Sequence, residues 1–237
     1  MIKQAIIPLA GLGTRLLPLT SVIPKELLPI NGRPGLEYIL DECIESGIKE
    51  VVLIISKKKE SIKKYFFNDK FYKSIIKKKV NDKKLKQEYL RIKKYKKMIK
   101  FVYQDSPKGT GDAVLKCKNL IKSNYFLMLM PDDLIIKSNC SKRLIELHYK
   151  FKSSVIASKK VKKKDVSRWG MFSLKKINSK NFIIKDVIEK PKIKDAPSNY
   201  AVIGRYILPK KIFSTLKKQK KGKNGEIHIT DSIKNLI

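Results

Sequence analysis

Cysteine, histidine and arginine are all scarce in this chain of 237 residues. The three cysteines, Cys43, Cys117 and Cys140, lie far apart without a CxxC pair, and only two histidines are present. This pattern argues against a disulfide framework and against a structural zinc site, and it suits a reducing cytosol.

Long hydrophobic runs are absent as well. No apolar segment approaches the roughly 18 residues that a membrane-spanning helix needs. Pro8, Gly11 and Arg15 interrupt the apolar N-terminal segment where a signal peptide would continue. We therefore expect a soluble, cytoplasmic protein that makes no membrane contact.

Acidic residues are few, with 21 against 55 basic ones and a formal net charge of +34. One explanation is a polyanionic partner such as nucleic acid. The other is an AT-rich genome, whose codons supply both lysine and isoleucine. Only six basic residues are arginine, the side chain that binds phosphates and bases bidentately. We therefore favour composition, do not expect a nucleic-acid partner, and keep a basic polyanion-binding protein as an alternative function.

What the chain does contain is an alternation of short apolar segments with amphipathic ones. The length and a hydrophobic content of 42% suit one large domain or two small ones. The predicted strands are 5–10, 51–55, 99–104 and 125–130, and the predicted helices are 36–46, 62–67 and 110–121. Such alternation predicts a mainly parallel sheet covered on both faces, with ligands bound beyond the carboxyl ends of the strands.

Two regions depart from this alternation. Residues 57–100 are rich in lysine and keep helical spacing, which predicts a helical insertion with a solvated lysine face. The second half of the chain has a strand-like pattern, which predicts an antiparallel or mixed extension of the same sheet. Its predicted strands are 154–161, 170–177, 182–189 and 199–208, followed by a helix over 210–218.

The loop after the first strand reads GLGTR. Gly11 and Gly13 would let backbone N–H groups approach a phosphate, and Arg15 adds a permanent positive charge. The loop lacks the GxxxxGK[ST] pattern and the third glycine of GxGxxG. Taken alone, it fits a phosphate site and a tight strand-to-helix turn equally well.

Further polar residues stand at the ends of predicted strands or in the loops just after them. An amide could read a base edge, a carboxylate after a strand is a typical Mg²⁺ ligand, and an acid beside a cation could bind a sugar hydroxyl and a phosphate. The residues concerned are Lys25, Glu26, Gln104, Gly109, Gly111, Asp132, Glu189 and Lys190. Because these positions share one edge of the predicted sheet, they predict one site.

The segments GLGTR, PKELLP, QDSPKGTG, MPDD, EKP, SNYAVIGRY and GEIHITD follow one another along the chain. In this order they resemble the sugar-nucleotide pyrophosphorylase family. Glu26 after Lys25 is similar to the UTP–glucose branch, whereas the thymidylyl branch typically has glutamine there. The resemblance implies a Rossmann-like three-layer α/β/α fold with a mixed, mainly parallel sheet. It also implies uridylyl transfer from UTP to glucose 1-phosphate, giving UDP-glucose and pyrophosphate, with Mg²⁺ as cofactor.

The resemblance also implies roles for single residues. The nucleotide would be bound by Leu9, Ala10, Gly11, Gly13, Thr14, Glu26, Gln104 and Gly109. The sugar phosphate would be bound by Gly170, Glu189, Lys190, Asn199 and Val202. The catalytic groups would be Arg15, Lys25, Asp132 and Lys190, with Asp132 as the metal ligand.

The family usually continues past GEIxxTD, with a second metal-binding aspartate and helices used in oligomer contacts. We therefore expect residues 1–237 to form a single nucleotidyltransferase domain that lacks this C-terminal portion, and keep a homo-oligomer as an expectation. Two enzyme-related alternatives stay open. One is a related pyrophosphorylase that uses dTTP or another sugar phosphate, and the other is an inactive, truncated remnant.

Overall fold

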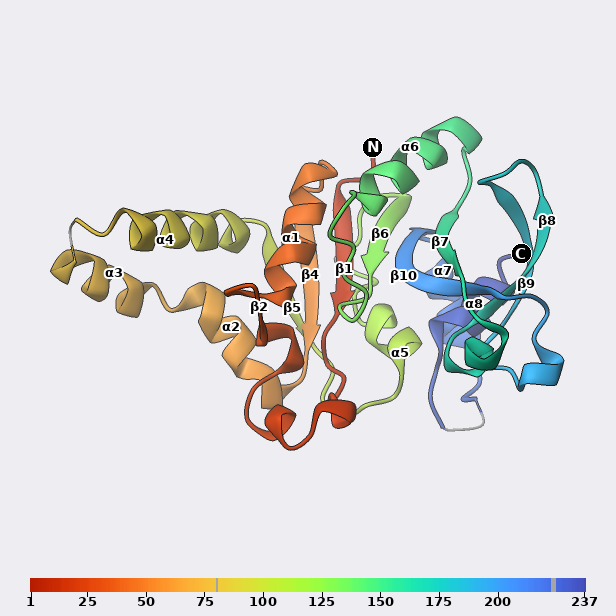
Figure 1. The fold of residues 1–237 in the computed structure, drawn as a ribbon, viewed down its shortest axis with the longest axis horizontal. Helices are drawn as coiled ribbons and strands as arrows, with labels where there is room; N and C mark the ends of the chain where they lie inside the picture. The colour runs from red at the N-terminus through yellow and green to blue at the C-terminus, as the bar shows by residue number, and fades with distance from the viewer. Residues whose placement is uncertain (80, 223–224) are drawn as a thin grey trace.

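One sheet of eight strands organises the chain (Figure 1). The computed structural model describes residues 1–79, 81–222 and 225–237. The strands of this sheet are β1 (Gln4–Pro8), β4 (Glu50–Ile55), β5 (Ile99–Tyr103), β6 (Tyr125–Leu129), β7 (Val155–Lys160), β8 (Met171–Lys176), β9 (Phe182–Ile188) and β10 (Tyr200–Pro209). A separate hairpin pairs β2 (Pro29–Ile30) with β3 (Arg33–Pro34).

The sheet is parallel in its first half and antiparallel in its second. Its order is β5-β4-β1-β6-β10-β8-β9, with β7 also paired to β10. Strands β5, β4, β1 and β6 run parallel to one another, and β10 runs antiparallel to β6, β7 and β8. The mainly parallel sheet and its mixed extension are thus confirmed, and both halves of the chain contribute to it.

Helices cover both faces of the sheet, as expected. Because side chains alternate along a strand, Ile7 of β1 belongs to one core and Ile6 to the other. The first face is covered by α1 (Gly35–Glu45), α2 (Glu60–Phe67), α4 (Lys83–Lys96) and α6 (Cys140–Phe151). The second face is covered by α5 (Thr110–Leu115), α7 (Ile212–Lys218) and α8 (Ile229–Lys234). The result is a three-layer α/β/α arrangement.

The lysine-rich insertion forms an arm made of α2, α3 (Asp69–Lys78) and α4, which projects from the sheet (Figure 1). Its base is packed into the first core through apolar side chains of α2 and α4, whereas α3 has no buried residue. The buried carboxylate of Glu37 in α1 ties the arm to the body. It accepts hydrogen bonds from Tyr65 Oη at 2.5 Å and from Arg91 Nε at 2.9 Å.

Helices α5 and α6 differ from the sequence-based expectation. Helix α5 ends at Leu115 instead of continuing to residue 121, because the next residues form tighter i to i+3 hydrogen bonds such as Leu120 N–H to Cys117 O. Helix α6 was not predicted. Its signal was the side chain of Asn139, which accepts a hydrogen bond from Lys142 N–H and caps the helix.

The cysteines pack inside the molecule. Cys43 and Cys117 are buried and Cys140 is partly buried, and all three are free thiols. Burial raises the pKa of the Cys117 thiol to about 12, so it stays protonated near neutral pH. None of the described helices is long and apolar enough to cross a membrane.

Candidate active site

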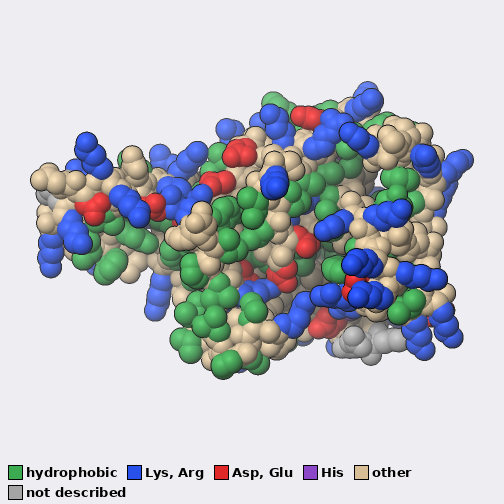
Figure 2. Space-filling view, viewed as in Figure 1, with side chains coloured by type: hydrophobic (Ala, Val, Ile, Leu, Met, Phe, Trp, Pro, Cys, Tyr) green, Lys and Arg blue, Asp and Glu red, His purple; other side chains and the backbone are tan. Residues whose placement is uncertain are grey.

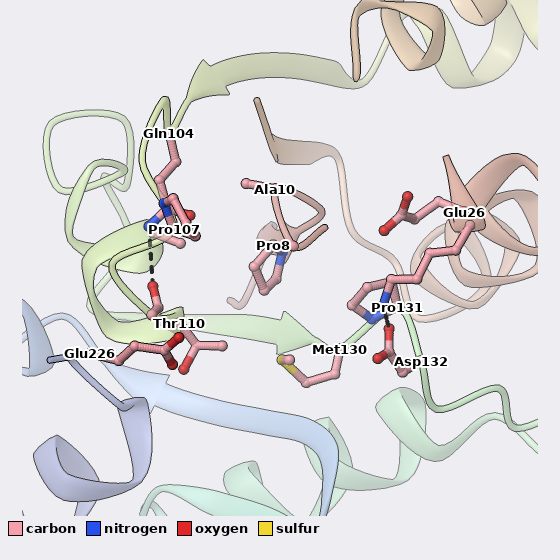
Figure 3. Close-up of a pocket in the computed structure, with 14 residues that line it drawn as sticks. Pro8, Ala10, Glu26, Gln104, Pro107, Thr110, Met130, Pro131, Asp132 and Glu226 are labelled. Atoms are coloured by element: carbon pink, nitrogen blue, oxygen red, sulfur yellow. Dashed lines mark hydrogen bonds and ion pairs between the residues drawn. The ribbon is translucent and has the colours of Figure 1, made fainter. Parts of the chain in front are cut away.

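The carboxyl ends of β1, β5 and β6 open onto two adjoining cavities. The first has a volume of about 210 Å³ and is shown in Figure 3. It is lined by Pro8, Ala10, Gly11, Lys25, Glu26, Gln104, Pro107, Gly109, Thr110, Ala113, Met130, Pro131, Asp132 and Glu226. These residues come from five separate segments, so the cavity exists only in the folded chain.

The second cavity is larger, at about 430 Å³. Its charged and polar lining includes Arg15, Arg168, Glu189, Lys190, Asp133, Tyr206, His228 and Thr230. Thr110, Met130, Asp132 and Glu226 line both cavities. A ligand in one cavity therefore lies next to a ligand in the other, with Asp132 between them.

Asp132 follows β6 and forms an ion pair with Lys25 of the 3-10 helix η3 (Lys25–Leu27). Its side chain is 48% exposed and that of Lys25 is 21% exposed. The two charges neutralise each other at the mouth of the first cavity. Both remain accessible to a ligand, because neither is sealed into the core.

Hydrogen bonds hold the loop after β6, which carries Asp132, against β10. Asp133 accepts a hydrogen bond from Gly204 N–H at 2.8 Å, and Met130 N–H donates to Gly204 O at 2.8 Å. Arg205 is fully buried, pairs with Glu42 at 2.7 Å and donates to Met130 O at 3.3 Å. This polar cluster joins β6 to β10, so the loop after β6 is held in place.

Glu189 and Lys190 stand where β9 ends, facing the second cavity. Glu189 accepts a hydrogen bond from Thr230 Oγ1 at 2.9 Å. Lys190 has a φ of 43°, a left-handed conformation that is uncommon for a residue with a side chain. Its N–H donates to Trp169 O at 3.2 Å. Such strained residues persist where the surrounding structure holds them, often at functional sites.

Gly109 and the segment before α8 lie in direct backbone contact. Gly109 has a φ of 95°, and a Cβ atom there would lie 2.5 Å from Ile227 O. Gly111 N–H donates to Ile227 O at 2.7 Å, and Ile227 N–H donates to Lys108 O at 2.8 Å. The glycines of this loop therefore allow the segment that carries Glu226 to approach closely and to line both cavities.

Gln104 is oriented by two hydrogen bonds from its amide nitrogen. Nε2 donates to Gly109 O at 3.1 Å and to Asp112 Oδ2 at 2.7 Å. Figure 3 places Gln104 and Glu26 on opposite sides of the first cavity, with Pro8 and Ala10 between them. A planar base could therefore be contacted from two sides.

The structure brings most of the expected site residues together. Among the described residues, those that were expected in the site but line neither cavity are Leu9, Gly13, Thr14, Gly111 and Asn199. Leu9 is fully buried and Thr14 is exposed, whereas Asn199 Nδ2 donates to Val161 O at 3.4 Å.

Residues that sequence reasoning missed include Thr110, Glu226 and Thr230. The last two belong to GEIHITD, which served only as a mark of resemblance.

The donor set fits a divalent cation that is shared with phosphates. No group of three His, Cys, Asp or Glu side chains close enough to hold a metal occurs among residues 1–79, 81–222 and 225–237. Mg²⁺, however, usually binds to one or two carboxylates, with phosphate oxygens and water as the other ligands. The partly exposed Asp132, which lines both cavities, suits this mode.

Comparison with known proteins agrees with this geometry. Residues 4–237 match the nucleotidyl transferase family. The chain belongs to this family. A UTP–glucose-1-phosphate uridylyltransferase 2 of Streptococcus pyogenes is 37% identical over 243 residues, covering 99% of this chain and 80% of that protein. This nucleotidyl transferase therefore shares nearly its whole length with that relative.

Two solved structures show the same fold. A UDP-glucose pyrophosphorylase complexed with UDP-glucose has a TM-score of 0.85 at 34% identity, over 100% of this chain and 87% of that one. A UTP-bound UGPase from Acinetobacter baumannii has a TM-score of 0.87 at 33% identity, over 100% and 82%. The Rossmann-like three-layer fold of this nucleotidyl transferase is thus confirmed.

Proposed function

We propose that the chain transfers a uridylyl group from UTP to glucose 1-phosphate, forming UDP-glucose and pyrophosphate. The observation that carries this proposal is the pair of adjoining cavities that share Asp132. The names of the relatives support the choice of substrates, since one is a UTP–glucose-1-phosphate uridylyltransferase and the two structures contain UTP and UDP-glucose.

The first cavity would bind the nucleotide. Ala10 and Gly11 line it from the end of β1, and Glu26 and Gln104 face each other across it. Arg15 lines the neighbouring cavity and carries a permanent charge that can bind two phosphate oxygens. The triphosphate would therefore extend from the first cavity towards Arg15, along the glycine-rich loop.

The second cavity would bind glucose 1-phosphate. The Glu189 carboxylate can accept hydrogen bonds from sugar hydroxyl groups, and the Lys190 ammonium can pair with the phosphate. Gly170 and Val202 add backbone and apolar contacts to the same cavity. The sugar phosphate would thus be held beside the α-phosphate of the nucleotide.

In the reaction, a phosphate oxygen of glucose 1-phosphate attacks the α-phosphorus of UTP in line. The bond from that phosphorus to the bridging oxygen breaks, and pyrophosphate leaves with the electron pair. The attacking phosphate is already ionised, so the protein needs no nucleophile or general base of its own. The work of Arg15, Lys25 and Lys190 is to position two anions and to neutralise the charge on the leaving group.

Mg²⁺ is the cofactor we propose, with Asp132 as its protein ligand. When bound, such a cation neutralises phosphate charge and orients the reacting groups. Lys25, which pairs with Asp132 in the structure, would then be free to contact phosphate oxygens instead.

We further propose that residues 1–237 act as one nucleotidyltransferase domain in the cytoplasm. Two findings support the single domain: both halves of the chain share one sheet, and the family match runs from residue 4 to 237. The three free cysteines are consistent with a reducing compartment. A homo-oligomer stays a prediction.

The test is pyrophosphate release by the purified chain with UTP, glucose 1-phosphate and Mg²⁺. We expect release that depends on the sugar phosphate and stops when the metal is chelated. Asp132→Asn should lower kcat by about 100-fold or more, whereas Asp195→Asn, at an exposed position of the 3-10 helix Ile193–Asp195, should not change it.

A folded chain that binds UTP yet releases no pyrophosphate would overturn the proposal. Replacing UTP with dTTP tests the related pyrophosphorylase. Equal rates with both nucleotides would show that the chain does not select uracil over thymine.

A further inference from the structure

A buried ion pair lies beside the first cavity. Glu26 of η3 and Lys59 of the 3-10 helix η4 (Lys57–Lys59) have side chains only 1% and 8% exposed. Lys59 Nζ donates to both carboxylate oxygens of Glu26, at 2.9 and 2.8 Å, and to the carbonyl oxygen of Leu9 at 2.6 Å. One ammonium group thus joins η4 to two segments that line the cavity, the loop after β1 and η3.

Lys59 is exceptional in this chain. It is the one lysine that is buried among the residues the structure describes, and its neighbours Lys57 and Lys58 are exposed. Burial lowers the pKa of the Lys59 ammonium, and the negative charge of Glu26 acts in the opposite direction. Because burying charges is expensive even when they are paired, stability alone is a weak reason for a pair at this place.

The position of Glu26 indicates another reason. Its side chain lines the first cavity, and Figure 3 shows it across that cavity from Gln104. Each carboxylate oxygen has about two lone pairs, and the hydrogen bonds from Lys59 use one lone pair of each oxygen. The carboxylate keeps accepting capacity for a ligand in the cavity, and as a carboxylate it has no proton to donate.

We propose that Lys59 is a positioning residue for nucleobase selection, which rests on the proposed function. It holds Glu26 as an acceptor that faces the base. Uracil has a ring N–H at N3 that can donate to such an acceptor, whereas cytosine has a lone pair at the same position. Cytosine would therefore place two acceptors against each other, a mismatch that costs affinity.

A glutamine at position 26 would not discriminate in this way. Its amide can turn to present either the oxygen or the NH₂ group, so it can pair with a donor or with an acceptor. The selection of uracil over cytosine therefore depends on the negative charge at Glu26 and on the lysine that keeps this charge in place.

The experiment measures dissociation constants of UTP and CTP by calorimetry, together with the KM of each substrate. The variants are Lys59→Met, Glu26→Gln and the double variant, with Lys58→Met as a matched control at an exposed neighbour. We expect the wild-type chain to bind UTP at least about 100-fold more tightly than CTP. Lys59→Met should reduce this ratio about tenfold, raise the KM for UTP and leave the KM for glucose 1-phosphate unchanged. Lys58→Met should leave the ratio as it is.

The double variant shows whether Lys59 acts through Glu26. In the Glu26→Gln background, Lys59→Met should change the UTP/CTP ratio no further. The inference is overturned if Lys59→Met alone retains the wild-type ratio, or if its effect is as large in the Glu26→Gln background as in the wild type. If Lys59→Met does not fold, Glu26→Gln and the double variant still test the inference. It is overturned if Glu26→Gln retains the wild-type ratio, or if the ratio differs between these two variants. A wild-type chain that binds no UTP would instead overturn the proposed function.

Discussion

At the scale of single residues, Lys190 combines a strained backbone with a charge that the proposed reaction needs. Its φ of 43° is in the left-handed region, where a residue with a side chain is destabilised by roughly 1 kcal/mol or more. The ammonium group lines the second cavity, where the sugar phosphate would bind. Stability and function therefore favour different residues at this position.

Lys190→Gly separates the two effects. We expect it to raise the free energy of unfolding by about 1 kcal/mol, because glycine adopts this conformation without strain. The same change should raise the KM for glucose 1-phosphate at least about tenfold, since a charged partner of the phosphate is lost. Urea unfolding and initial-rate kinetics measure the two quantities.

Lys152 provides the matched control. It also has a left-handed conformation, with φ 48°, but it ends α6 and lines neither cavity. Lys152→Gly should give a similar gain in stability without a change in KM. An unchanged KM in Lys190→Gly would contradict the role of Lys190 in binding the sugar phosphate.

At the scale of elements, the Gly109 loop and the segment before α8 contact each other, and both line the site. Two backbone hydrogen bonds join these parts of the chain, which are more than 110 residues apart in sequence, and there is no room for a side chain at Gly109. The site therefore depends on a close approach of two loops, one that follows β5 and one that lies between α7 and α8.

Gly109→Ala should lower the free energy of unfolding by about 2 kcal/mol or more, through strain at φ 95° and the clash with Ile227 O. Gly47→Ala isolates the strain, because Gly47 has φ 78° but open space around it. We expect Gly47→Ala to cost only about 1 kcal/mol and to leave catalysis intact. Equal losses in the two variants would show that the contact with Ile227 does not matter.

The strands and helices also show which parts of the fold can be predicted from the sequence alone. Strands such as β4 and β5 were predicted to within one residue, because buried parallel strands are short apolar runs with clear ends. Helix α6 was missed because charged residues mask its apolar positions, of which only Leu144 is a fully apolar buried side chain. For the site, local motifs predicted Asp132 and Lys190, but the burial of Glu26 against Lys59 needs the fold.

At the scale of the whole molecule, the excess of positive charge acts against the compact state. The net charge is +34, and residues 57–97 alone carry 18 basic and four acidic side chains. Figure 2 shows Lys and Arg side chains spread over the visible face, including the projecting arm. Like charges on a folded surface repel one another, and salt screens that repulsion.

Raising NaCl from 10 mM to 0.1 M should therefore raise the Tm. The Debye length falls from about 30 Å to about 10 Å over this range, and we expect a gain of about 3 °C, which corresponds to roughly 1 kcal/mol. Choline chloride should have the same effect if screening is the cause. A Tm that stays constant or falls would show that repulsion is not what limits stability.

The ion pair between Lys25 and Asp132 has a consequence for how substrates arrive. In the proposed reaction, a magnesium-bearing triphosphate brings a cation for the aspartate and anions for the lysine at the same moment. The two side chains can then exchange partners instead of first separating into water. Substrate binding then replaces each side chain's ionic partner directly, so that neither Lys25 nor Asp132 is left unpaired at any point.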